Sequence, residues 1–223
     1  VSMFTWVFRS ASAAAAELVQ DAGLAASWTS ARERLAALPT WPDGSWKPSE
    51  DWKERGFRPF APHPDLFELW PVSAADMVDA WQGTPEQSAQ AKATYQKWLG
   101  HHPLDTWDRC FPFIAAARMG DRAYAAKILE HMQSVPEAGN INRGDPPDAG
   151  KADGHNPFVV DAGSAFPAEV VGEFLLQSHS GIIRVFPAAP LTGHFAFHSL
   201  RARGAFLVSS DFRDGIVPYV LVQ

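Results

Sequence analysis

The spacing of apolar residues changes from a helical to a strand pattern along this chain of 223 residues. Over the first two-thirds, apolar positions recur at intervals of three and four residues, which is typical of helices packed on one face. From Ile182 onward, apolar and polar positions alternate, which is typical of half-buried strands. The pattern predicts a mainly α chain, with a helical domain over residues 1–180 and the beginning of a β-domain over residues 181–223.

Start and stop signals divide the first domain into short helices. Ser30 and Glu33 have the spacing of a capping box, in which each residue satisfies a backbone N–H group of the first turn. Thr84 and Gln87 have the same spacing, and Pro85 between them suits the first helical position. The expected helices cover residues 10–19, 30–38, 73–82, 84–99 and 164–178.

A helical hairpin is expected around Gly120 and Asp121. Gly120 suits the left-handed position after a helix, and Asp121 suits the N-cap of the next helix. Pro112 is expected to kink the first helix of this pair or to mark its start. Repeated hairpins of this kind are typical of bundles, solenoids and closed toroids, and the lack of a fixed-period repeat argues against a solenoid.

The last forty residues predict strands joined by tight turns. Residues 182–186 form one expected strand, and residues 204–212 and 216–222 flank Asp214-Gly215, a dipeptide that favours a two-residue hairpin. So few strands need a second layer to bury their apolar face. The chain is therefore expected to be truncated at its C-terminal end, within a β-sandwich.

Composition and charge narrow the classes of partner. The formal charge is −6 and the basic residues are not clustered, so nucleic acid is excluded as a main partner. No apolar run reaches the roughly 18 residues that a membrane span needs. Cys110 is the single cysteine, so no internal disulfide forms, and it is interpreted as a packing residue. The nine tryptophans are either packing residues or platforms for sugar rings.

The polar chemistry of the chain gathers in residues 136–164, a stretch long enough to be functional or disordered. Most of its Asp, Asn, Gly and Pro residues fit a solvated loop, and their spacing suits neither calcium nor zinc, so no metal and no cofactor are expected. Asp161 differs, because an apolar run precedes it and a predicted helix follows it. A partly desolvated carboxylate there suits a general base, whereas capping of the next helix is an equally good interpretation.

Several segments resemble glycoside hydrolase family 95, the inverting α-L-fucosidases and their α-L-galactosidase relatives. Residues 155–161 (His-Asn-Pro-Phe-Val-Val-Asp) resemble the Pro-Phe-x-x-Asp loop of the family. Residues 172–188 resemble its last toroid helix and first sandwich strand, and residues 200–206 resemble the following strand. Trp107 and residues 118–124 resemble the hairpin before the loop. The likeness is strongest after residue 100.

The resemblance implies the second part of an (α/α)6 toroid, followed by the beginning of an antiparallel β-sandwich. It also implies cleavage of terminal α-L-fucosyl or related bonds in an oligosaccharide or glycoconjugate, with inversion by a Glu acid and an Asp base about 6.5–9.5 Å apart. Asp161 aligns with the base. Substrate contacts are expected from His155, Asn156, Phe158, Trp107, His63 and Asp65. Secretion or a periplasmic location would follow from the same resemblance.

Three departures from the family pattern affect the expected site. The Asp-Gly-Asn-Phe-Gly of the family is replaced at residues 161–166 by Asp-Ala-Gly-Ser-Ala-Phe, so an Asn beside Asp161 is lost. Its Ser-His-Leu becomes Pro-Asp-Leu at residues 64–66, with His63 displaced. The acid Glu and an Asn pair are expected upstream of Val1, so this piece alone is expected to be inactive. A non-catalytic carbohydrate-binding or scaffold protein on the same fold is the alternative.

Overall fold

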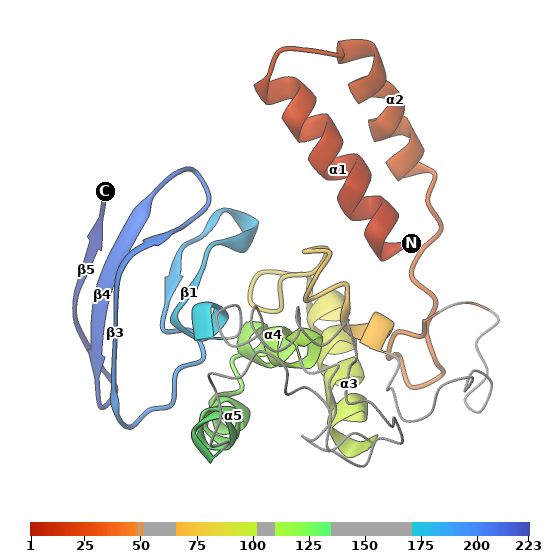
Figure 1. Ribbon diagram of the computed structural model, residues 1–223. Helices are drawn as coiled ribbons and strands as arrows, with labels where there is room; N and C mark the ends of the chain where they lie inside the picture. Colours follow the sequence, from red (N-terminus) through yellow and green to blue (C-terminus); the bar gives the residue numbers. More distant parts are fainter. Residues whose placement is uncertain (49, 51–65, 102–109, 135–170) are drawn as a thin grey trace, which may run out of the picture. The chain divides into compact units, whose positions relative to one another are not determined.

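The computed structural model describes residues 1–48, 50, 66–101, 110–134 and 171–223, which are coloured in Figure 1. These residues divide into two compact units. The first unit contains the described residues up to 50 and residues 66–97, and the second contains all described residues from 98 onward. Helix α3 (Pro85–His101) contributes to both units.

A helical hairpin of α1 (Ser2–Glu17) and α2 (Ala22–Glu33) begins the first unit (Figure 1). Asp21 precedes α2 with a left-handed backbone, at φ 52°, and turns the chain back. Arg9 of α1 donates hydrogen bonds to the carbonyl oxygens of Ala75 and Asp76, at 3.0 and 2.6 Å. Little of this hairpin is buried, since Ala15 is the one buried residue within its two helices.

The rest of the first unit is a small core formed by loops, the short 3-10 helix η1 (Leu66–Leu69) and α3. The start of α3 confirms the predicted capping box. The Thr84 hydroxyl accepts a hydrogen bond from the Gln87 N–H at 3.2 Å, and the Gln87 side chain accepts one from the Thr84 N–H at 3.1 Å. The buried apolar residues of this core include Trp46, Leu69, Val72, Ala75, Val78, Ala91 and Tyr95.

The second unit contains the predicted helical hairpin, formed by α4 (Cys110–Met119) and α5 (Arg122–Ser134). Gly120 has a φ of 71°, and the Asp121 carboxylate accepts a hydrogen bond from the Tyr124 N–H at 2.9 Å. Both features were expected from the sequence, and both are confirmed. In contrast to α1 and α2, α4 is deeply buried over residues 113–117.

A short ribbon and a three-stranded sheet complete the second unit. After a helical turn at residues 171–175, β1 (Leu176–Gln177) pairs antiparallel with β2 (Arg184–Val185), and η2 (His179–Gly181) lies between them. The sheet has the antiparallel order β3-β4-β5. Its strands are β3 (His194–Arg201), β4 (Leu207–Arg213) and β5 (Ile216–Val222).

Aromatic side chains fill the core between the ribbon and the sheet. The ring of Phe186 lies 5.2 Å from that of Phe197 and 5.3 Å from that of Phe212, measured between ring centroids. Val208 of β4 is fully buried beside them. Between β4 and β5, Asp214 and Gly215 both have positive φ, as the predicted two-residue hairpin requires. The hairpin is therefore confirmed.

The predicted fold class is wrong for the described part of the chain, which is a mixture of helices and strands rather than mainly α. Neither a closed toroid nor a β-sandwich is found among the described residues, whose sheets have two and three strands. The physical reason is that helix and turn signals act within a few residues. They predict single helices and hairpins, whereas the closure of a ring depends on packing between elements distant in sequence.

Three predicted helices also need correction. Ser30 lies inside α2 rather than at a helix start, and its hydroxyl accepts a bond from Arg34 at 3.3 Å. Residues 73–82 are not helical. The Asp79 carboxylate accepts hydrogen bonds from the N–H groups of Trp81 and Gln82, which stabilises a local turn in place of a helix. The helix expected to reach residue 178 ends at Leu175, where pairing of β1 with β2 overrides helix propensity.

Candidate functional site

The first unit contains a hollow of about 320 Å³, a volume at the lower end of small-ligand pockets. Its walls come from the first two residues, from the chain before and after a tight turn, and from the region around η1. Charged groups of both signs reach it, from Lys47, Glu50 and Glu68. Such a lining can donate hydrogen bonds to a small polar molecule and accept them from it.

A tight turn, Trp41-Pro42-Asp43-Gly44, connects two of these walls. Proline presets the first central position of a turn, and Gly44 supplies a left-handed backbone at φ 85°. The Trp41 N–H donates to the Ser45 carbonyl oxygen at 2.7 Å, and Thr40 and Trp46 form a bridge across the turn. The Pro-Asp-Gly sequence thus folds locally into the reversal that brings the Trp46 side of the turn to the hollow.

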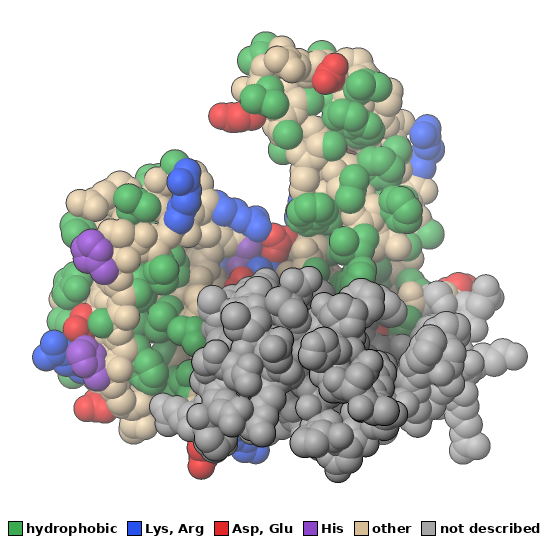
Figure 2. Space-filling model, in the orientation of Figure 1, with side chains coloured by type: hydrophobic (Ala, Val, Ile, Leu, Met, Phe, Trp, Pro, Cys, Tyr) green, Lys and Arg blue, Asp and Glu red, His purple; other side chains and the backbone are tan. Residues whose placement is uncertain are grey.

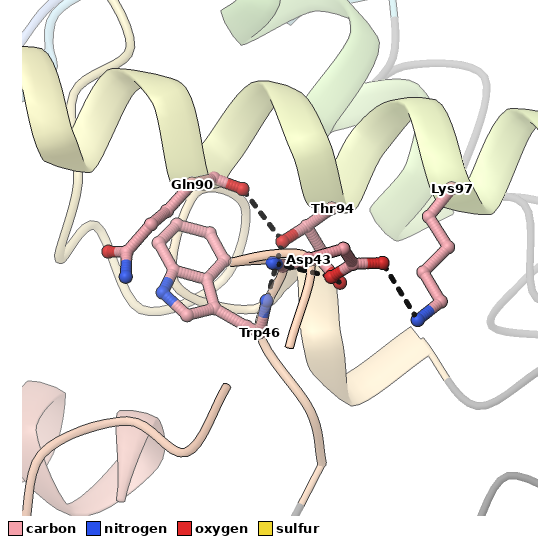
Figure 3. Close-up of polar contacts among 6 residues, drawn as sticks. Asp43, Trp46, Gln90, Thr94 and Lys97 are labelled. Carbon is pink, nitrogen blue, oxygen red and sulfur yellow. Dashed lines mark hydrogen bonds and ion pairs between the residues drawn. The ribbon is translucent and has the colours of Figure 1, made fainter. Parts of the chain in front are cut away.

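Helix α3 holds this turn in place (Figure 3). The buried hydroxyl of Thr94 accepts a hydrogen bond from the Trp46 N–H at 2.9 Å and donates one to the Gln90 carbonyl oxygen at 2.8 Å. The Lys97 ammonium lies 3.4 Å from the Asp43 carboxylate. Two long-range contacts therefore connect the turn to successive turns of one helix.

The electrostatics of the turn favour an ionised Asp43. The Ser45 hydroxyl and backbone N–H donate to its carboxylate at 2.5 and 2.9 Å, and these hydrogen bonds, followed by the charge of Lys97, lower its pKa. The ammonium groups of Lys97 and Lys47 lie 4.5 and 5.5 Å from the centroid of the Trp41 ring. Because cations of the chain itself contact this ring, Trp41 acts in fixing the turn.

A second polar group lies on the β3–β5 sheet. The Asp211 carboxylate accepts hydrogen bonds from Nε and Nη2 of Arg213, at 2.9 and 3.3 Å. Its Oδ2 atom also lies 3.0 Å from Nε2 of His194. Hydrogen bonding from Arg213 and then from His194 lowers the pKa of Asp211, and the same bond raises the pKa of Arg213. This network keeps the three side chains in fixed positions.

None of the residues expected to form the glycosidase site lies in the described part of the chain. They are Asp161, His155, Asn156, Phe158, Trp107, His63 and Asp65. The substrate contacts expected from these residues stay predictions. So do the two roles considered for Asp161, the helix cap and the general base.

Two arginines of the α4–α5 hairpin bind the segment that resumes at residue 171. Arg118 donates from Nε and Nη2 to the two carboxylate oxygens of Glu173, at 3.1 and 2.8 Å, in a largely buried ion pair. Arg122 donates to the carbonyl oxygens of Phe186 and Ala189. The α4–α5 hairpin and residues 173–189 are thus joined by fixed, charge-assisted contacts.

Sequence reasoning missed most of these polar contacts for an identifiable reason. The Pro-Asp-Gly turn has a local signal that was available in the sequence. Its partners Thr94 and Lys97 are 48 and 54 residues away from the groups they bind, and no local pattern connects them. His194 and His198 both lie in β3, and the side chain of His194 is exposed.

Comparison with known proteins gives no further assignment: no protein-family model matches the chain, and no curated protein matches it. The described helices include none that is both long enough and apolar enough to cross a membrane. In the same part of the chain, no three or more His, Cys, Asp and Glu side chains come together as a metal site would require.

Proposed function

We propose that the chain acts in the hydrolysis of terminal α-L-fucosyl or related glycosidic bonds, with Asp161 as the general base of an inverting reaction. The observation that carries this proposal is the likeness of residues 155–161 and 172–188 to a catalytic loop and to the segment that follows it in glycoside hydrolase family 95. The substrate class is an oligosaccharide or a glycoconjugate.

The contacts at the two ends of residues 135–170 support the proposal. Arg118 and Arg122 precede this stretch, and their partners Glu173 and Phe186 follow it. The chain therefore leaves from and returns to the same unit, through elements fixed by charge-assisted hydrogen bonds.

The proposed chemistry needs two carboxyl groups on opposite sides of the scissile bond. The Asp161 carboxylate would accept a proton from water while the water oxygen bonds to the anomeric carbon. A second carboxyl group would give its proton to the departing glycosidic oxygen. A separation of about 6.5–9.5 Å between the two groups leaves room for the water. Attack from the opposite face converts an α-L-glycoside into a β-L-sugar.

Hydrolysis of an aryl α-L-fucoside and an aryl α-L-galactoside tests this proposal, with the longest polypeptide that carries these 223 residues. The variant Asp161→Asn keeps the size of the side chain but removes its basic oxygen. It is expected to lower kcat by about 10²- to 10⁴-fold, the usual contribution of a general base. Nuclear magnetic resonance of the parent reaction should show the β-anomer of the free sugar first.

The matched control is Asp153→Asn, a substitution of the same kind eight residues earlier in the sequence. It is expected to leave kcat unchanged. An unchanged rate in Asp161→Asn, or an equal loss in both variants, would remove Asp161 from the mechanism.

A non-catalytic carbohydrate-binding protein is the second candidate. The observation that favours it is the replacement of the Gly-Asn-Phe of the family by Ala162-Gly163-Ser164 beside the expected base. Calorimetric binding of L-fucose without turnover of either aryl glycoside would support this candidate over the enzyme.

A further inference from the structure

The face of the β3–β5 sheet that points away from its aromatic core carries a preorganised polar cluster. Successive residues of a strand point to opposite faces, so Asp211 and Arg213 point away from the side on which Phe212 packs. Asp211 is directly opposite Tyr219 of β5, and directly opposite residues share a face. The hydrogen bond from His194 to Asp211 places His194 on that face as well. Figure 2 shows histidine, basic and acidic side chains gathered over the strands.

The cluster leaves donors directed to solvent. Both oxygens of Asp211 are engaged by Arg213 and His194, so the carboxylate holds these two side chains in place. Nη1 of Arg213 and Nδ1 of His194 make no hydrogen bond with any described residue. The two side chains are 67% and 58% exposed, so the Nη1 donor of Arg213 and the Nδ1 atom of His194, an acceptor when Nε2–H donates to Asp211, are both within reach of a ligand.

An exposed aromatic ring lies beside these donors. Tyr219 is 51% exposed and pairs directly with Asp211, whose carboxylate accepts from Arg213, so the ring and the guanidinium group lie on the same face of the sheet. A tyrosine ring offers a flat apolar surface with one polar end. Because its side chain has only two rotatable bonds, holding the ring against a ligand costs little conformational entropy. A flat ring with fixed donors at its edge matches the two surfaces of a pyranose, which has an apolar face and a rim of hydroxyl groups.

The charge of the cluster favours a neutral sugar over an acidic one. The charge of Arg213 is compensated by Asp211 at hydrogen-bond distance, so the cluster offers donors without an uncompensated positive charge. The chain as a whole carries a formal charge of −6, which opposes the approach of a polyanion. Vicinal hydroxyl groups of a sugar can accept hydrogen bonds from the free N–H groups of the guanidinium, so the ligand needs no anionic group.

We propose that this outer face of β3–β5, with Tyr219 as the platform, Arg213 as the donor and Nδ1 of His194 as an acceptor, binds a pyranose unit of a neutral polysaccharide. Only the choice of a sugar as ligand rests on the proposed function. The site is separate in sequence from Asp161 and would keep a carbohydrate chain attached while hydrolysis takes place elsewhere on the protein.

Affinity electrophoresis in gels containing fucosylated xyloglucan tests the proposal, with polygalacturonate as the acidic counterpart. The chain should be retarded by the neutral polysaccharide only. Tyr219→Ala should raise the dissociation constant by about tenfold or more, in line with the loss of one stacking contact. Tyr219→Phe keeps the ring and should stay within about threefold of the parent. Arg213→Met should weaken binding while keeping the apolar part of the side chain.

The matched control is Val220→Ala, because Val220 pairs with Ser210 and lies on the opposite face of the same exposed strand. It should bind as the parent does. Equal binding by the parent and Tyr219→Ala would overturn the proposal, and so would retardation by polygalacturonate alone or an equal loss in Val220→Ala. Circular dichroism of each variant separates loss of binding from loss of fold.

Asp161→Asn distinguishes this proposal from the proposed hydrolytic function. Binding to the sheet should be unchanged in that variant, whatever happens to turnover. Conversely, Tyr219→Ala should leave hydrolysis of a small aryl glycoside unchanged, because such a substrate has no polysaccharide chain to attach. Loss of xyloglucan binding in Asp161→Asn would assign the binding to the hydrolytic site and overturn the sheet site.

Discussion

The α1–α2 and α4–α5 hairpins, both in the described part of the chain, differ sharply in burial. In α4, residues 113–117 are all almost inaccessible to solvent, and Tyr124 of α5 packs edge-on against Phe113 at 5.6 Å. In α1, Phe4 is 61% exposed, and its ring stacks only on that of Phe8, at 6.3 Å. Both hairpins contain alanine-rich helices, so composition does not explain the difference.

Contacts from outside each hairpin account for this contrast. Among the described residues, Arg9 connects α1 to the rest of the first unit through hydrogen bonds to two carbonyl oxygens. The α4–α5 hairpin has two such arginines, Arg118 and Arg122, in addition to its buried aromatic and alanine residues. Most of the stability of a helix comes from such tertiary packing rather than from propensity.

The largest expected effect comes from removing an aromatic ring in each hairpin. Phe113→Ala should lower the free energy of unfolding by about 3–5 kcal/mol, because Phe113 is 3% exposed and its loss leaves a cavity. Phe4→Ala should change it by less than about 0.5 kcal/mol, as is usual for exposed positions. Urea unfolding of both variants measures the difference. Equal losses would show that the α1 face is covered in solution.

Breaking the ion pair beside α4 should have the next largest effect. Arg118→Met leaves the carboxylate of Glu173 largely buried without this partner, which should cost about 3 kcal/mol. The double variant Arg118→Met with Glu173→Met should recover part of that loss, since no unpaired charge remains. Lys97→Met, at the exposed pair with Asp43, should cost about 1 kcal/mol or less. A loss at Lys97 as large as that at Arg118 would contradict this ranking.

Arg9→Ala tests the single anchor of the other hairpin. The loss of two charge-assisted hydrogen bonds should accelerate amide exchange in α1 and α2 by roughly tenfold. Exchange in α4 and α5 should not change. The control is Arg34→Ala, because the one side-chain bond of Arg34 is an exposed contact with Ser30. Faster exchange in that variant as well would mean that charge, rather than anchoring, determines the result.

The smallest expected effect is the response of the two units to acid. Asp43 in the first unit and Asp211 in the second both have a pKa lowered by hydrogen bonds. A carboxyl group whose pKa is lower in the folded state stabilises the fold above its unfolded pKa of about 3.9, and this stabilisation is lost as the pH falls through the folded pKa. Stability should therefore fall below about pH 4, and less steeply in Asp43→Asn and Asp211→Asn.

Thermal melts between pH 5 and pH 2 measure this response. The change in melting temperature should be small, because at least one partner of each ion pair is largely exposed to solvent. Asn replacement at Glu17, an exposed acidic residue of α1, is the control and should leave the pH profile unchanged. Parallel profiles for the parent and both Asp variants would show that these hydrogen bonds add nothing to stability.

The sequence by itself determined the features whose signals lie within a few residues. The capping box of Thr84 and Gln87, the junction at Gly120 and Asp121, and the Asp214-Gly215 hairpin all form as expected. In the two helix starts a side chain accepts a hydrogen bond from an N–H group three positions away, and the Asp214-Gly215 turn joins Arg213 and Ile216, which pair three positions apart. Such signals are complete in themselves, because no distant residue is needed to satisfy them.

Burial, the association of these elements and the meeting of polar side chains depend instead on long-range packing. Ser30 and Glu33 have the same spacing as Thr84 and Gln87, yet α2 already begins at Ala22 and runs through them. Likewise, Thr94 and Lys97 carry no pattern that connects them to the turn at Asp43. The physical reason is the sequence distance over which each interaction acts. Hydrogen bonds within a turn are specified by neighbouring residues, whereas burial and ion pairing depend on residues that only the folded chain brings together.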